Sequence, residues 1–141
     1  MAEVIARDLL RDTPGAEVAS AGVSALDGGP ATPPAVAAAA ELGLELADHR
    51  SQPVTAVSVD RADHVWTMTG AHLDLLLARF PEAAGKAETL DPDADVADPI
   101  GGSLGDYRVT AEQIKTALLR RLGGGGAGRA ARPAAPTERG R

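Results

Sequence analysis

RADHVWTMTGAHLDLLLARF, residues 61–80, predicts a β-strand followed directly by an α-helix. Residues 62–68 have the β-branched and aromatic character of a strand. Thr69-Gly70 opens the helix, and Phe80-Pro81 ends it, because proline cannot continue a helix. A strand that leads directly into a helix is the unit from which parallel sheets are built.

The elements on either side of this unit continue the alternation. Residues 17–23 and 86–90 predict two more strands, and residues 2–11 predict a short amphipathic helix. A further helix begins at Thr32-Pro33 and stops at Gly43. The last helix covers residues 104–122, with four side chains facing inward: Tyr107, Ile114, Leu118 and Leu122. The sequence therefore predicts an α/β fold, a parallel sheet with helices on both faces. Such a domain normally begins with a strand, whereas this chain begins with a helix.

Length and composition limit the kind of protein this is. The 141 residues suffice for one domain, and they include no cysteine. Disulfides, thiolate metal sites and a cysteine nucleophile are thus excluded within this chain. No apolar run approaches the ~20 residues that span a bilayer. The N-terminus lacks the basic region and cleavage site of a signal peptide. We expect a cytoplasmic protein without a membrane partner.

Charge divides the chain into two parts. Residues 129–141 contain four of the 14 basic residues and one of the 20 acidic ones, so the rest carries a formal charge of −9. An acidic body argues against nucleic-acid binding, which needs a basic face. Residues 123–141 consist mainly of Gly, Ala, Pro and Arg, which predicts a disordered tail. We expect a single domain over residues 1–122.

Asp98-Pro99-Ile100-Gly101-Gly102 is the stretch most suggestive of a site. An aspartate in such a setting often just caps its own turn. A functional interpretation is also open, because the stretch follows a predicted strand and ligands bind at the carboxyl ends of parallel strands. Pro99 would stiffen the loop, and the two glycines would allow close approach to a ligand. Residue types alone favour the turn, whereas the position after a predicted strand favours a functional site.

The sequence contains no pattern typical of a metal-binding site. The three histidines, His49, His64 and His72, share no metal-binding spacing. Asp91, Asp93 and Asp95 alternate as in a calcium loop, but the glycine and glutamate that such a loop requires are missing. We interpret this stretch as a solvated acidic loop. No metal or cofactor is expected.

With these stretches in order, the sequence resembles the low-molecular-weight protein-tyrosine phosphatase family, in the bacterial branch that includes protein-arginine phosphatases. MAEVIARDLL resembles the helix after that family's Cys-x5-Arg-Ser-Pro phosphate loop. The other matching stretches are Ser20-Ala-Gly22, residues 29–35, His49-Arg-Ser51, residues 62–68 with His72, and Asp98-Pro99-x-Gly-Gly-Ser103 with Tyr107. Each is short, but all follow the family's order and spacing.

The resemblance implies a flavodoxin-like fold and a phosphatase reaction without a cofactor. In the family, a cysteine thiolate takes the phosphoryl group, backbone N–H groups and an arginine hold its oxygens, and an aspartate protonates the leaving group. Asp98 matches that general acid. Ser20 and His49 match positions that support the phosphate loop, and Pro99 and Ile100 match the substrate cleft. The implied partner is a phosphorylated protein.

Two departures from the family pattern affect these expectations. Ile100 replaces a residue that is commonly aromatic, so phosphotyrosine and phosphoarginine both stay open as substrates. The chain also lacks the first strand, which is central in the family's sheet, and with it the cysteine and the arginine. We expect an N-terminally truncated member that is inactive as it stands. The alternatives are a non-catalytic pseudophosphatase that binds a partner and a relative resembling arsenate reductases. A receiver-like signalling domain lacks support, since no acidic cluster follows a first strand.

Overall fold

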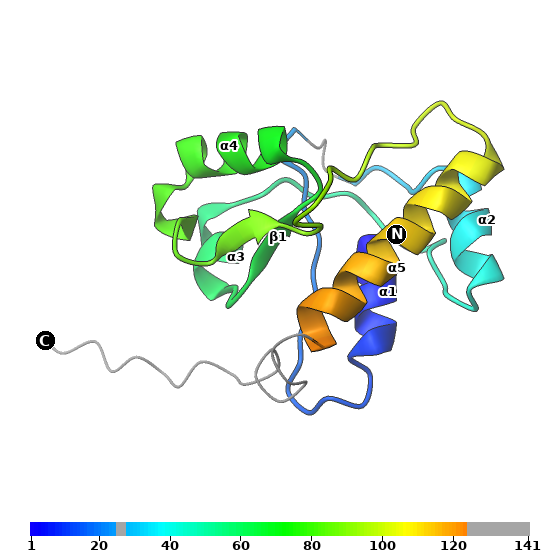
Figure 1. Ribbon diagram of the computed structural model, residues 1–141, viewed down its shortest axis with the longest axis horizontal. Helices are drawn as coiled ribbons and strands as arrows, with labels where there is room; N and C mark the ends of the chain where they lie inside the picture. The colour runs from blue at the N-terminus through cyan, green and yellow to red at the C-terminus, as the bar shows by residue number, and fades with distance from the viewer. Residues whose placement is uncertain (25–27, 124–141) are drawn as a thin grey trace, which may run out of the picture.

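The computed structural model describes residues 1–24 and 28–123 (Figure 1). The predicted tail lies outside these residues, apart from Gly123. In chain order the elements are α1 (Ala2–Leu9), α2 (Pro33–Glu41), α3 (Ala56–Arg61), β1 (Val65–Thr67), α4 (Gly70–Arg79), the 3-10 turn η1 (Pro81–Ala83), β2 (Ala87–Thr89) and α5 (Leu104–Gly123).

The sheet of the described residues has two parallel strands, β1 and β2, joined through α4. Val65 lies opposite Ala87, and Thr67 lies opposite Thr89. Both strands fall within the predicted ranges but are only three residues long. The predicted strand–helix–strand unit is therefore confirmed, in a shortened form.

Helices cover both faces of this small sheet. Trp66 packs against a buried cluster formed mainly by α1 and α5. Its neighbour Val65 points to the opposite face, where it packs against Val59 of α3 and Leu76 of α4. Figure 1 shows α1, α2 and α5 gathered on one side of the molecule and α3 and α4 on the other. This arrangement agrees with the predicted α/β class.

The prediction of a regular strand over residues 17–23 is wrong. In this stretch only Gly22 forms a bridge, a parallel one to Pro53. Residues 17–21 pair with no strand in the described part of the chain, and β1 pairs only with β2. A strand exists only where a neighbour accepts its backbone hydrogen bonds. The residues have the composition of a strand, but no neighbouring strand pairs with them among the described residues.

The helices follow the sequence signals closely. α2 begins after Thr32 and ends before Gly43, whose φ of 75° is the left-handed conformation that favours glycine. In α5, Tyr107, Ile114 and Leu118 are buried as predicted, and Leu122 is half-buried. The one helix that is not predicted is α3, only six residues long. It is started by a capping box, in which Thr55 and Ser58 bond each other's backbone N–H groups.

No helix within residues 1–24 and 28–123 is both long and apolar enough to cross a membrane.

Candidate active site

Asp98 lies just past the carboxyl end of the sheet. The loop that leads to it crosses the end of β1, where the N–H group of buried Val96 donates to the carbonyl of Met68 at 2.8 Å. One residue earlier, the Asp95 carboxylate accepts the N–H of Gly70 at 2.9 Å and so fixes the loop to the start of α4. Ligands of parallel α/β domains bind at this edge.

The Asp98 side chain is exposed and is also part of its own turn. Its Oδ1 accepts the N–H of Ile100 at 3.0 Å, as a turn aspartate does. Its Oδ2 makes no hydrogen bond within the described residues. Ile100 is 70 % exposed and points away from the core.

A tight turn and a helix cap fix the loop after Asp98. The N–H of Gly102 donates to the carbonyl of Pro99 at 2.8 Å, and Gly101 has a φ of 80°. Asp106 then accepts from both the N–H and the hydroxyl of Ser103, while the N–H of Asp106 donates back to Ser103 Oγ. This reciprocal pair caps the N-terminus of α5. The loop of residues 90–103, called the acid loop because it carries Asp98, is thereby anchored to the longest helix of the described residues.

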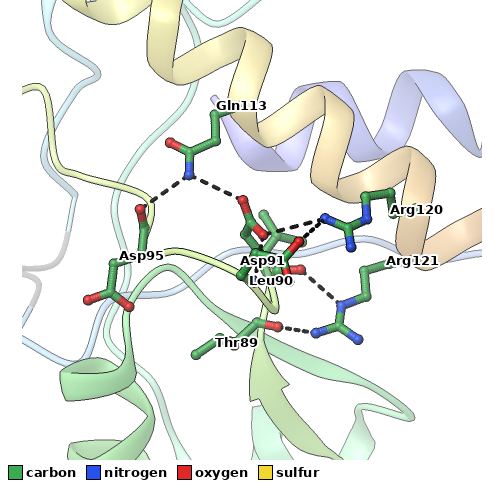
Figure 2. Close-up of polar contacts among 8 residues, drawn as sticks. Thr89, Leu90, Asp91, Asp95, Gln113, Arg120 and Arg121 are labelled. Atoms are coloured by element: carbon green, nitrogen blue, oxygen red, sulfur yellow. Dashed lines mark hydrogen bonds and ion pairs between the residues drawn. The ribbon is translucent and has the colours of Figure 1, made fainter.

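A second group of polar contacts joins the start of the acid loop to the C-terminal half of α5 (Figure 2). The side-chain amide of Gln113 donates to Asp91 at 3.3 Å and to the backbone carbonyl of Asp95 at 3.2 Å. Arg120 pairs with Asp91 at 3.8 Å and with Asp93 at 2.8 Å. Figure 2 shows Gln113 between the two ends of this loop segment, which it holds against the helix.

Arg121 continues this contact into the sheet. Its guanidinium donates to the carbonyls of Thr89 and Leu90, at 2.5 and 2.9 Å, at the end of β2. These carbonyls lie where the strand ends and have no further strand to bond in the described part of the chain. The arginine therefore completes the backbone hydrogen bonding of the strand end.

Asp91 is less solvated than we predicted. Its side chain is only 15 % exposed. The hydrogen bond from the N–H of Asp93 lowers the pKa of Asp91, and the Gln113 amide and Arg120 act in the same direction. Asp91 thus organises the loop, whereas Asp93 remains at the surface. No group of three or more potential metal ligands occurs among the described residues.

Ser20 and His49 meet at one carboxylate, that of Glu3 in α1. Ser20 Oγ donates to Glu3 Oε2 at 2.5 Å, and His49 Nδ1 lies 3.3 Å from the same oxygen. Arg7, one turn further along α1, pairs with Glu3 Oε1 at 2.6 Å and donates to the carbonyl of Val18. The sequence analysis assigned no role to Glu3. Its spacing of four residues from Arg7 is the sequence signal for it, because such pairs meet on one helix face.

The start of α1 lies in the same core region as the acid loop. Met1 and Ala2 pack against the cluster that contains Val96, two residues before Asp98. Burial lowers the pKa of the Met1 amino group, an effect larger than the opposing attraction of Glu3. No hydrogen bond or ion pair among the described residues joins Asp98 to Glu3, Ser20 or His49. The two groups are thus separate in their polar contacts.

Residues 1–123 match the family model of the low molecular weight phosphotyrosine protein phosphatases. The chain belongs to this family. The match covers the whole described domain, including the acid loop and the Glu3 cluster.

Relatives of this chain include proteins described as protein-arginine phosphatases and as probable protein-tyrosine phosphatases. The chain is 40 % identical to a protein-arginine-phosphatase of Geobacillus stearothermophilus over 115 residues, 78 % of this chain and 77 % of the relative. It is 37 % identical to EpsP of Ralstonia nicotianae, described as a probable low molecular weight protein-tyrosine-phosphatase, over 79 % of each chain.

Its fold is similar to that of the YwlE arginine phosphatase from Geobacillus stearothermophilus. The TM-score is 0.83 at 35 % identity, and the alignment covers 91 % of this chain and 84 % of that one. The small parallel sheet and its helices therefore have the family's architecture.

Proposed function

We propose that this domain is the acid-bearing part of a phosphatase that hydrolyses phosphotyrosine or phosphoarginine in proteins, with Asp98 as the general acid. The observation that carries the proposal is the position of Asp98, on an anchored loop at the carboxyl edge of the sheet in a chain of this family. One of its carboxylate oxygens has no hydrogen-bond partner among the described residues. Protonation of the leaving group by such an acid contributes ~10²–10⁴ in rate.

The reaction needs groups that these 141 residues do not contain. The family's nucleophile is a thiolate, and the chain has no cysteine. The proposal therefore requires a first strand, a phosphate loop and its arginine that the 141 residues do not supply, and it predicts that the 141 residues alone are inactive as a phosphatase. The packing of Met1 and Ala2 near Val96 supports this, because a phosphate loop joined to the start of α1 would lie beside the Asp98 loop.

The remaining site residues have supporting roles. Ser20 and His49, held by Glu3, would steady a phosphate loop placed ahead of α1. Pro99 and Ile100 would line the cleft in which the substrate side chain lies. An exposed isoleucine offers no ring for stacking, so it does not favour phosphotyrosine over phosphoarginine.

The test supplies the missing groups. The chain is extended ahead of Met1 by a short apolar strand and a Cys-x5-Arg-Ser-Pro loop, and hydrolysis of phosphotyrosine and phosphoarginine peptides is measured. We expect activity without added metal, abolished when the added cysteine is replaced by serine. Asp98→Asn should lower kcat by about 100-fold or more with little change in KM. Asp63→Asn, at an exposed aspartate outside the loop, is the matched control.

Two results would contradict the proposal. One is a folded extended protein that hydrolyses neither substrate. The other is equal activity of Asp98→Asn and Asp63→Asn. A second candidate function, a non-catalytic domain that binds phosphorylated proteins, is favoured by the absence of cysteine. It would gain support if the 141-residue chain alone bound a phosphopeptide and Asp98→Asn left that binding unchanged.

A further inference from the structure

Tyr107 joins the start of α5 to the start of α2. The residue is only 4 % exposed, and it packs in one buried cluster with three alanines of α2, Ala35, Ala38 and Ala39. Its hydroxyl is hydrogen-bonded at 3.0 Å to the hydroxyl of Thr32, the residue that precedes α2. Its N–H group donates to the carbonyl of Ser103 at 3.2 Å. Tyr107 therefore contacts both α2 and the residue that ends the acid loop.

The Thr32 hydroxyl bonds Tyr107 and not its own helix. A threonine that precedes a helix usually accepts the N–H group of the second or third helical residue. Thr32 makes no such bond, and the second residue of α2 is Pro34, which has no N–H group. The start of α2 thus leaves this hydroxyl available for a partner on another helix.

The bond between the two hydroxyls fixes how α5 lies along α2. Apolar packing has no preferred direction, and a row of alanine methyl groups offers few grooves that would hold a ring in one place. A hydrogen bond, in contrast, weakens steeply when its geometry changes. Arg108 and Glu41 form a second tie between these helices, at 2.6 Å, but both side chains are exposed, so that pair contributes little.

Thr32 also leads to the second group of candidate residues. It follows residues 28–30, and the N–H of Ser51 donates to a carbonyl of that stretch at 2.7 Å. Ser51 lies two residues after His49 in the same loop. The bond between Tyr107 and Thr32 therefore connects the acid loop to the loop of His49, although these two groups share no direct polar contact.

We infer that Tyr107 is a positioning residue for Asp98, and that it acts through its bond to Thr32. This bond sets the start of α5, and with it the acid loop, in one place relative to the loop of His49. A general acid must lie within hydrogen-bond reach of the leaving group, and a displacement of ~1 Å costs up to ~10²-fold in rate. The catalytic part of the inference rests on the proposed function, whereas the link itself is a property of the 141-residue chain.

A double-mutant cycle of Tyr107→Phe and Thr32→Val tests the link by amide hydrogen exchange of the 141-residue chain. Each variant should speed exchange at Ser103 and Ser51 by about 2- to 10-fold relative to Leu90, whose N–H group bonds across the sheet. The double variant should exchange no faster than either single variant, because both substitutions remove the same bond.

Kinetics of the extended protein test the positioning of the acid. Tyr107→Phe should lower kcat about tenfold or more with little change in KM. In the Asp98→Asn background the same substitution should cause no further loss, because there is then no acid to position. A merely structural role would lower activity in both backgrounds alike. Thr116→Val, at an exposed threonine of α5, is the matched control and should change neither exchange nor kcat.

Two results would overturn the inference. One is an additive cycle, or equal acceleration at Ser103, Ser51 and Leu90, since either means that the substitutions only lower general stability. The other is an equal loss of kcat from Tyr107→Phe with and without Asp98. Failure of the proposed function is distinguishable from both, because it appears as equal activity of Asp98→Asn and Asp63→Asn while Tyr107 is intact.

Discussion

Replacement of Gly102 by alanine should loosen the acid loop without disturbing the rest of α5. A Cβ at this position would lie 2.8 Å from the carbonyl oxygen of Pro99 and 2.6 Å from Asp106 Oδ2. The first atom is backbone and accepts the N–H of Gly102 itself, so it can move only if the turn opens. The second accepts both capping bonds of Ser103.

The expected change in the local free energy of opening follows from the hydrogen bonds that must weaken or break. Loss of the turn hydrogen bond costs about 0.5–1.5 kcal/mol. Weakening of the cap costs about 1 kcal/mol. The local free energy of opening should therefore fall by about 1.5–2.5 kcal/mol, and at about 1.4 kcal/mol per tenfold the N–H of Ser103 should exchange about 10- to 60-fold faster.

Amide hydrogen exchange of the 141-residue chain measures this effect directly. Gly105→Ala is the matched control, since Gly105 lies in the first turn of α5 and its Cβ would approach only Ser103 Oγ at 3.5 Å, an ordinary contact. Alanine there should leave the exchange of Ser103 unchanged or slow it, because alanine is the better helix former. If the N–H of Ser103 exchanges at the same rate in the Gly102→Ala and Gly105→Ala variants, the loop does not depend on the turn and the reasoning fails.

Three further predictions concern acid stability, specificity and the stability of the chain alone. Because the folded-state pKa of Asp91 is lowered, its stabilisation is complete above its ordinary pKa of about 3.8 and is lost as the pH falls through the lowered value. Asp91→Asn should therefore flatten the loss of stability below about pH 4, measured by urea unfolding across a pH series; an unchanged slope would contradict this. In the extended protein, Ile100→Tyr should raise kcat/KM for phosphotyrosine relative to phosphoarginine peptides, since ring stacking contributes about 0.5–1.5 kcal/mol; an equal or reversed ratio would count against it. The 141-residue chain alone should be marginally stable, because the two-stranded sheet of its described residues leaves strand edges unpaired; cooperative unfolding as a monomer above about 50 °C would show otherwise.

The helices could be predicted from the sequence because their ends are set by local chemistry. Thr32-Pro33 begins α2 and Gly43 follows its end; Thr69 begins α4, whose end is set by Pro81. Each of these signals acts within one turn of helix and needs no distant partner. α3 escaped prediction because its capping box, Thr55 with Ser58, lacks the Glu or Gln that normally marks this motif in a sequence.

Strand pairing could not be predicted in the same way. Residues 17–23 and 62–68 have similar apolar and β-branched character, yet only the second stretch contains a regular strand. The two stretches differ in whether a pairing strand lies beside them. A short helical connection brings β2 next to β1, whereas residues 17–21 have no strand to pair with in the described residues. Composition predicts which residues can pair, and only the complete fold decides whether they do.

The site shows the same limit at the level of side chains. The family pattern singled out Asp98, Ser20 and His49, but not the groups that hold them. Glu3 brings Ser20 and His49 together from a distance of 17 or more residues in sequence, and Gln113 holds the start of the acid loop from the middle of α5. Such partners belong to other elements, so their spacing in sequence carries no signal. Asp98 itself bonds its own turn, which is the structural interpretation that residue types favour. The acid role proposed for it therefore depends on the place of the anchored turn at the carboxyl edge of the sheet, and contacts from the end of β1, from α4 and from α5 together create that place.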